Sequence, residues 1–320
     1  MKIGLDVMGG DFAPGSNISG ALLALKELPL TDRIVLIGDK DIILAELEKR
    51  NANPSDFSIV HAHEVIGMGE HPVRAITRKP DSSISIGFKQ LKLKKIDAFA
   101  SAGSSGAMLV GAIYSVNNIQ GVIRPCTSAV LPQESGGLSL LLDVGTNPDA
   151  KPDVMYQFGL LGSITAKNVY NIQNPRVALL NIGHEEEKGN LLTQATYQLM
   201  KDSKDFNFVG NIEGRDLLRN KADVIVCDGF TGNIVLKNME GMFRIIMKRG
   251  LVDDYFARFN YEKYGGTPIL GINSTVIVGH GISNDIAVKN MLMLARDVHH
   301  AKLSQKVKHA LANIAIIVRD

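Results

Sequence analysis

Short apolar runs alternate with stretches of helical periodicity along the whole chain. The runs predict β-strands near residues 2–7, 33–38, 57–61, 97–101, 125–131, 138–144, 176–182, 206–210, 223–228 and 274–279. Apolar residues recurring every three or four positions predict helices over 16–28, 40–50, 82–94, 106–118, 151–173, 189–202, 231–249, 284–299 and 302–318. This alternation predicts an α/β fold with right-handed crossovers and a largely parallel sheet covered by helices on both faces.

One part of the pattern departs from strict alternation. Between residues 124 and 147, two strand signals are joined by the short polar turn 131–137, which favours an antiparallel hairpin. No linker, repeat or low-complexity segment divides the chain. We therefore expect a single domain over residues 1–320.

Five of the apolar runs stop at a polar residue followed closely by glycine. These joints span residues 5–11, 99–106, 142–147, 180–183 and 226–233. In an open parallel sheet, such joints emerge along the carboxyl edge, where α/β proteins bind ligands. Five joints of this kind predict a shared ligand site.

Composition narrows the class of protein. The chain has 320 residues, of which 45% are hydrophobic and 21% charged, as in ordinary globular proteins. A formal net charge of +2 does not imply a nucleic acid partner. The two cysteines, Cys126 and Cys227, lack metal-ligand spacing and favour a reducing compartment. With no signal peptide pattern and no apolar stretch of membrane-spanning length, we expect a cytoplasmic protein.

Two of the joints have the chemistry of an anion site. Ser104, Ser105 and Gly106 precede an apolar helix, so two hydroxyls and free backbone N–H groups would face a ligand at a helix N-terminus. Thr231 and Asn233 repeat this arrangement before another helix. The alternative is that these residues only cap helices and form turns.

The acidic residues at the joints require another explanation. Asp6, Asp11, Asp143 and Asp228 lack His or Cys neighbours at ligand spacing, so no metal site is expected, and helix capping or orientation of donors is favoured. The charged run 184–190 directly follows a strand end. Its Lys188 could place a cation over a bound phosphate, and a merely solvated charge run is the alternative.

Four further residues receive more modest predictions. His61 and His63 lie on one face of a strand without a third metal ligand, and Cys227 is expected to be a small buried side chain. His280 follows another apolar run and is expected at the same edge, with Ser283 or Asn284 capping the next helix.

Taken together, the motifs resemble those of a known family, the bacterial phosphate acyltransferases of the PlsX family. The resemblance spans nearly the whole chain in order and is carried by the segments Leu5–Asp11, Ser101–Gly106, Leu141–Gly145, Leu179–Gly183, Gly210–Asp216, Val226–Asn233, Tyr264–Gly266 and His280–Gly281. It implies an enzyme that reversibly transfers a long-chain fatty acyl group from acyl carrier protein to inorganic phosphate. The acyl phosphate formed would enter phospholipid synthesis.

The resemblance also implies a fold and a set of site residues. It predicts a Rossmann-like three-layer α/β/α fold, similar to phosphotransacetylases and isocitrate dehydrogenases, in a homodimer without cofactor or metal. Lys188 and Asn233 are the implied catalytic residues. The implied substrate-binding residues are Asp6, Gly9, Gly10, Asp11, Ser104, Ser105, Gly106, Asn181, Asp228, Thr231 and Gly232.

The implied reaction needs little general acid–base catalysis. Phosphate is substantially dianionic at neutral pH and can attack a thioester once it is positioned and its charge is compensated. A thiol with a reference pKa of about 8.5 is a good leaving group. We therefore expect direct transfer without an acyl-enzyme.

Two features depart from the family pattern. Ser104-Ser105 stands where the family has Asn-Thr, so hydroxyls are kept and an amide is lost. The segment 240–264 is shorter than the helical hairpin that many relatives use for dimerisation and membrane contact. It still carries apolar and basic side chains, namely Met242, Phe243, Ile246, Met247, Phe256, Arg244, Lys248, Arg249 and Arg258.

The partner of this shortened segment is left open by the sequence. A membrane surface, the acidic carrier protein, the dimer partner and the downstream membrane glycerol-3-phosphate acyltransferase are alternatives to simple packing on the core.

Two other classes of protein share parts of this pattern. A nicotinamide-dependent oxidoreductase would have the same architecture, but no Gly-x-Gly-x-x-Gly follows the first strand. A noncatalytic acyl- or phosphate-binding protein is the second alternative.

Overall fold

The structure is a computed structural model that describes residues 1–313. The chain folds into two compact units. The first comprises residues 1–117 and 261–302, and the second comprises residues 118–260 together with the described residues from 303 onward. Each unit has its own sheet and helices, and each is described by itself.

The first unit is built on a parallel sheet. Its strands are β1 (Lys2–Asp6), β2 (Arg33–Gly38), β3 (Ser58–His61), β4 (Ala98–Ser101), β10 (Thr267–Leu270) and β11 (Thr275–Val278). Their order is β3-β2-β1-β4-β11-β10, and only β10 runs antiparallel to its neighbour β11. Its helices are α1 (Gly15–Leu25), α2 (Lys40–Glu48), α3 (Pro72–Arg78), α4 (Ser83–Lys92), α5 (Ser105–Val116) and α9 (Asp285–His300).

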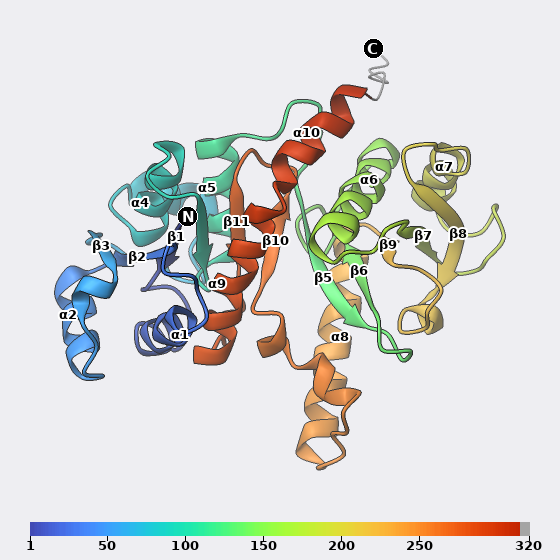
Figure 1. Ribbon diagram of the computed structural model, residues 1–320. Helices are drawn as coiled ribbons and strands as arrows, with labels where there is room; N and C mark the ends of the chain where they lie inside the picture. Colours follow the sequence, from blue (N-terminus) through green and yellow to red (C-terminus); the bar gives the residue numbers. More distant parts are fainter. Residues whose placement is uncertain (314–320) are drawn as a thin grey trace. The chain divides into compact units, whose positions relative to one another are not determined.

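Helices cover both faces of this first sheet (Figure 1). The helices α3, α4 and α5 lie over one face, and α1 and α9 pack together over the other. The core beneath α4 and α5 includes Phe88 and Phe99, whose rings meet edge to face with centroids 5.1 Å apart. Apolar residues fill both faces of the strands, as expected of a parallel sheet covered on both sides.

The second unit repeats this layered plan. Its strands are β5 (Cys126–Pro132), β6 (Leu138–Leu142), β7 (Arg176–Asn181), β8 (Asn207–Glu213) and β9 (Val224–Val226), in the order β5-β6-β9-β7-β8. Its helices are α6 (Pro152–Val169), α7 (Leu191–Met200), α8 (Gly229–Lys248) and α10 (Leu303–Asn313). The helices α6, α7 and α10 form one layer, and α8 packs on the opposite face over Leu141, Ile225 and Cys227.

The predicted α/β fold is confirmed, as is the hairpin, since β5 and β6 pair antiparallel. Short single-turn helices occur at Pro54–Asp56, Gly214–Asp216, Phe256–Phe259 and Tyr261–Lys263. The sequence patterns missed β10 and α3. The predicted end of the last helix, at residue 318, lies outside the described residues, and the single domain over 1–320 stays a prediction.

Within residues 1–313, no helix combines the length and apolarity needed to cross a membrane.

Candidate active site

In the first unit, the loops after β1 and β4 are tied together by a buried carboxylate. Asp6 is fully buried and accepts a hydrogen bond from the Ser101 hydroxyl at 2.7 Å and another from the Met8 N–H at 3.0 Å. The Ser101 oxygen in turn accepts the Gly103 N–H at 2.9 Å. Burial raises the pKa of Asp6 above its ordinary value, although these hydrogen bonds oppose the rise.

Glycines allow these two loops to approach each other closely. A Cβ atom at Gly9 would lie 2.7 Å from the Gly103 nitrogen, so only a residue without a side chain fits. Gly10 has a φ of +103°, in the left-handed region that favours glycine. The Asp11 N–H donates to the Gly281 carbonyl at 2.7 Å, which brings the loop after β11 to the same edge. The predicted location of the His280 segment is thus confirmed.

The N-terminus of α5 follows directly from the β4 loop. Ser104 is its N-cap, and the Ser104 oxygen accepts the Ala107 N–H at 3.3 Å. Ser104 is buried, whereas Ser105 is exposed and offers its hydroxyl to solvent. Gly106 lies against Pro72 of α3, where a Cβ atom would come within 2.5 Å of the proline ring. This helix end has the donors expected of an anion site.

In the second unit, Asp143 has a role like that of Asp6. It is fully buried at the end of β6 and accepts the Thr127 N–H at 3.1 Å, the Asn147 N–H at 2.6 Å and the Asn147 side-chain amide at 3.0 Å. Burial raises the pKa of Asp143, against the effect of these donors. The Gly229 N–H then donates to the Asn147 carbonyl at 2.8 Å. Asp143 therefore fixes the loop against which α8 begins.

The start of α8 carries several predicted site residues. Asp228 is the N-cap and accepts the Thr231 N–H at 2.9 Å and the Thr231 hydroxyl at 2.7 Å. Gly232 is buried against the backbone of Asp143, and a Cβ atom there would overlap the Asp143 carbonyl oxygen. Asn233 is exposed, and its side-chain oxygen lies next to Gly145. Its amide is therefore accessible to a ligand.

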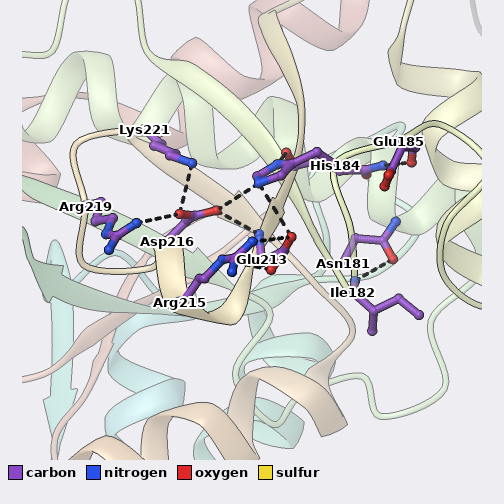
Figure 2. Close-up of polar contacts among 10 residues, drawn as sticks. Asn181, Ile182, His184, Glu185, Glu213, Arg215, Asp216, Arg219 and Lys221 are labelled. Carbon is purple, nitrogen blue, oxygen red and sulfur yellow. Dashed lines mark hydrogen bonds and ion pairs between the residues drawn. The ribbon is translucent and has the colours of Figure 1, made fainter.

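The loop between β7 and α7 presents Lys188. The Asn181 amide donates to the Lys188 carbonyl at 3.0 Å. The Ile182 N–H donates to the Asn181 oxygen at 2.9 Å (Figure 2). Gly189 follows with a φ of +97°, packed so tightly on Asn181 that no side chain fits. The Lys188 side chain is exposed. The Asn181 side chain thus shapes the loop by hydrogen bonding to the loop backbone.

The predicted site residues fall into two groups. Asp6, Gly9, Gly10, Asp11, Ser104, Ser105 and Gly106 belong to the first unit, and Asn181, Lys188, Asp228, Thr231, Gly232 and Asn233 belong to the second. Hydrogen bonds join the joints at Asp6 and Ser101 in the first unit and those at Asn147 and Gly229 in the second. Their contacts with substrate stay predictions.

Sequence reasoning missed other residues at these edges. Ser101, Asn17 and Asn147 organise the loops, and the Asn17 amide donates to the carbonyls of Val7 and Gly9 at 2.8 and 2.9 Å. Ser101 and Asn147 stood inside the quoted motifs, which was the available signal. Asn284, as predicted, caps α9 by accepting the Ala287 N–H at 3.0 Å.

Cys227 is a small buried side chain, as predicted, but of the two histidines only His61 lies on a strand, because β3 ends at that residue. Cys227 is 2% exposed, and burial, with Asp228 and Asp143 nearby, raises the pKa of its thiol well above the ordinary value. His61 and His63 contact each other, with Nε2 and Nδ1 3.0 Å apart. In the described part of the chain, no group of three or more His, Cys, Asp or Glu side chains could hold a metal ion.

The segment 240–264 divides into a packed part and an exposed part. Phe243 stacks on Phe259, and Arg258 donates to the Gln133 carbonyl at 2.9 Å. The end of α8 instead exposes a set of apolar side chains that we call the α8 tip: Met242 (52%), Ile245 (51%), Met247 (50%) and Leu251 (62%). Arg244, Lys248 and Arg249 are exposed beside them.

Comparisons with known proteins agree with the motifs. The family described as Fatty acid synthesis protein matches residues 1–252. A phosphate acyltransferase of Syntrophomonas wolfei is 42% identical over 320 residues, covering 98% of this chain and 100% of that protein. One from Dictyoglomus turgidum is 40% identical over 333 residues, covering 98% of each.

Solved structures show the same architecture at low sequence identity. A branched-chain phosphotransacylase from Enterococcus faecalis matches with a TM-score of 0.64 and 13% identity, covering 94% of this chain and 99% of that one. A phosphotransacetylase from Streptococcus pyogenes gives a TM-score of 0.63 at 16% identity, covering 93% and 94%. These likenesses confirm the predicted fold. The family match and the full-length relatives together show that the chain belongs to the PlsX family of phosphate acyltransferases.

Proposed function

We propose that this protein transfers a long-chain fatty acyl group from acyl carrier protein to inorganic phosphate, and so supplies acyl phosphate for phospholipid synthesis. The observation that carries the proposal is the 42% identity to a phosphate acyltransferase over the full length of that relative. An oxygen of phosphate attacks the thioester carbonyl carbon, the C–S bond breaks, and the carrier thiolate leaves and takes up a proton. No cofactor enters this scheme.

The residue roles follow from charge and accessibility. The N–H groups and hydroxyls at the start of α5, from Ser104 to Gly106, bind phosphate. The exposed Lys188 compensates negative charge, and the exposed Asn233 amide donates to the oxyanion that develops on the carbonyl. Asp6 and Asp228 are occupied by hydrogen bonds to protein donors, so their contribution is to hold the loops.

A variant of Lys188 tests these roles and separates an enzyme from a binding protein. We expect Lys188→Ala to lower kcat by about 10²- to 10³-fold, the usual loss for one electrostatic contact to the transition state, while acyl carrier protein still binds. Lys204→Ala is the matched control, since Lys204 is an exposed lysine on the surface of the same unit. Equal turnover in both variants would refute the role of Lys188.

Assembly is the second part of the proposal. We propose a cytoplasmic homodimer that touches the membrane peripherally through the α8 tip, because exposed apolar side chains flanked by Arg and Lys suit an anionic lipid surface. Ile245→Glu should abolish sedimentation with vesicles of anionic phospholipid. Light scattering on the same variant identifies the alternative: a monomeric variant that still binds vesicles would place the tip in the dimer interface instead.

A further inference from the structure

One motif of the sequence has no part in the reaction as proposed, and it lies against the loop that carries Lys188. The segment Gly210–Asp216 forms the end of β8 and the turn after it, beside the β7–α7 loop of residues 182–190 (Figure 2). The Asn211 amide donates to the Glu185 carbonyl at 2.8 Å. In return, Nδ1 of His184 donates to the Asn211 carbonyl at 3.1 Å. Each segment therefore binds the backbone of the other.

A bulge in β8 places Asn211 at this position. Val177 of β7 pairs with Phe208 and Leu179 pairs with Asn211, so β8 advances three residues where β7 advances two. The bulge contains Gly210, which has a φ of +94°, in the left-handed region that favours glycine. Bulges of this kind commonly redirect a side chain beside a functional site.

Two carboxylates complete the contact with His184. Its Nε2 lies 3.5 Å from Oδ2 of Asp216 and 3.6 Å from Oε1 of Glu213. The Asn211 carbonyl accepts a hydrogen bond from Nδ1, whereas the two carboxylates flank Nε2 at longer distances. The ring is thereby held at Nδ1 and enclosed by the two carboxylates.

Asp216 itself is rigidly held. Its side chain is fully buried, with Nζ of Lys221 at 3.0 Å and Nη1 of Arg219 at 3.6 Å. The Glu213 N–H donates to Asp216 at 3.3 Å. Burial alone would raise the pKa of Asp216, but the Lys221 and Glu213 hydrogen bonds and the nearby His184 keep it below the ordinary value. A buried, ionised carboxylate paired with nearby cations is a firm anchor.

From these contacts we infer that His184, Asn211 and Asp216 form a clamp that positions the Lys188 loop. They are positioning residues, because none of them needs to touch substrate. The clamp holds the start of the loop, and Asn181, through the Lys188 carbonyl, holds its end. A loop fixed at both ends keeps the Lys188 ammonium in the geometry that charge compensation requires, and small displacements of such groups are costly. This inference rests on the catalytic role proposed for Lys188.

Amide hydrogen exchange and steady-state kinetics on the full chain test the clamp together. We expect His184→Ala and Asn211→Ala to speed exchange in residues 183–189 by about tenfold, since each removes one hydrogen bond to the loop or its anchor. They should lower kcat by about tenfold with little change in KM for the acyl carrier substrate, because a misplaced Lys188 weakens the transition state. His184→Asn, which keeps a donor near the Nδ1 position, should recover part of both losses.

Arg215→Ala is the matched control. The Arg215 side chain pairs with Glu213 at 3.0 Å and is 68% exposed. It should change neither exchange nor kcat. Unchanged loop exchange in His184→Ala and Asn211→Ala would overturn the clamp, as would faster exchange with an unchanged kcat. If Lys188→Ala retains turnover while the clamp variants still loosen the loop, the role of Lys188 fails and the link from clamp to catalysis fails with it.

Discussion

Acidic residues at the strand ends take distinct roles in the structure. Asp6 and Asp143 are buried and gather donors from neighbouring loops, whereas Asp228 caps α8. Asp11 stays exposed. The sequence favoured capping and orientation of donors over metal binding, and the contacts of Asp6, Asp143 and Asp228 are of those two kinds.

Asp143 offers the sharpest test of this organising role. Both of its oxygens accept hydrogen bonds, so the amide of Asp143→Asn must point an N–H group at another donor. We expect the free energy of unfolding to fall by about 1–3 kcal/mol, the cost of leaving a buried donor unsatisfied. Asp228→Asn is the control, because Asn caps helices as well as Asp does. Urea denaturation of both variants measures the difference, and equal stability would contradict this role.

Cys227 should be dispensable for the reaction. Its thiol is buried, its pKa is raised, and its Sγ donates to the Asp143 carbonyl at 3.6 Å. Such a thiol is a poor nucleophile. Cys227→Ala should keep kcat within a few-fold of the wild type, and mass spectrometry of a single turnover should find no acyl adduct on the wild-type protein. An adduct on Cys227 would show an acyl-enzyme instead of direct transfer.

At the scale of helices and strands, the sequence patterns predicted most elements because their apolar periodicity is regular. They missed β10, where Pro268 lies in a short strand between glycines that is recognised by its antiparallel pairing with β11. They missed α3, a short helix that buries only Ala75. Ser101 was missed as a site organiser for a related reason: its partner Asp6 is 95 residues away in the sequence. Local patterns do not reveal such long-range partners.

Two glycines of α8 illustrate how position decides a glycine's role. A Cβ at Gly232 would overlap the backbone of Asp143, whereas nothing lies within 4 Å of a Cβ at Gly241. Gly232→Ala should lower the free energy of unfolding by about 1–3 kcal/mol or more through overpacking. Gly241→Ala should raise it by up to about 1 kcal/mol, because Ala favours the helix. Thermal unfolding of the two variants measures both changes in stability. A Gly241→Ala variant less stable than the wild type would be inconsistent with the packing of α8.

For the whole molecule, the ordered set of motifs was more informative than any single joint. Each joint alone is compatible with a simple turn or helix cap, and two of the predicted residues, Ser104 and Asp228, do cap helices. The relatives match over nearly the full chain, from the first strand through both units. The family and fold could therefore be predicted from the sequence. The contacts that position each loop depend on tertiary packing and required the structure.

The most direct test of the central claim follows the atoms of phosphate. The purified protein is given palmitoyl acyl carrier protein and phosphate fully labelled with ¹⁸O, and the products are measured by mass spectrometry. We predict palmitoyl phosphate that retains all the labelled oxygens, formed in step with free carrier thiol, since a phosphate oxygen attacks the thioester directly. Absence of palmitoyl phosphate at saturating substrates would contradict the assigned activity. Release of the carrier thiol with free palmitic acid as the only acyl product would contradict it as well.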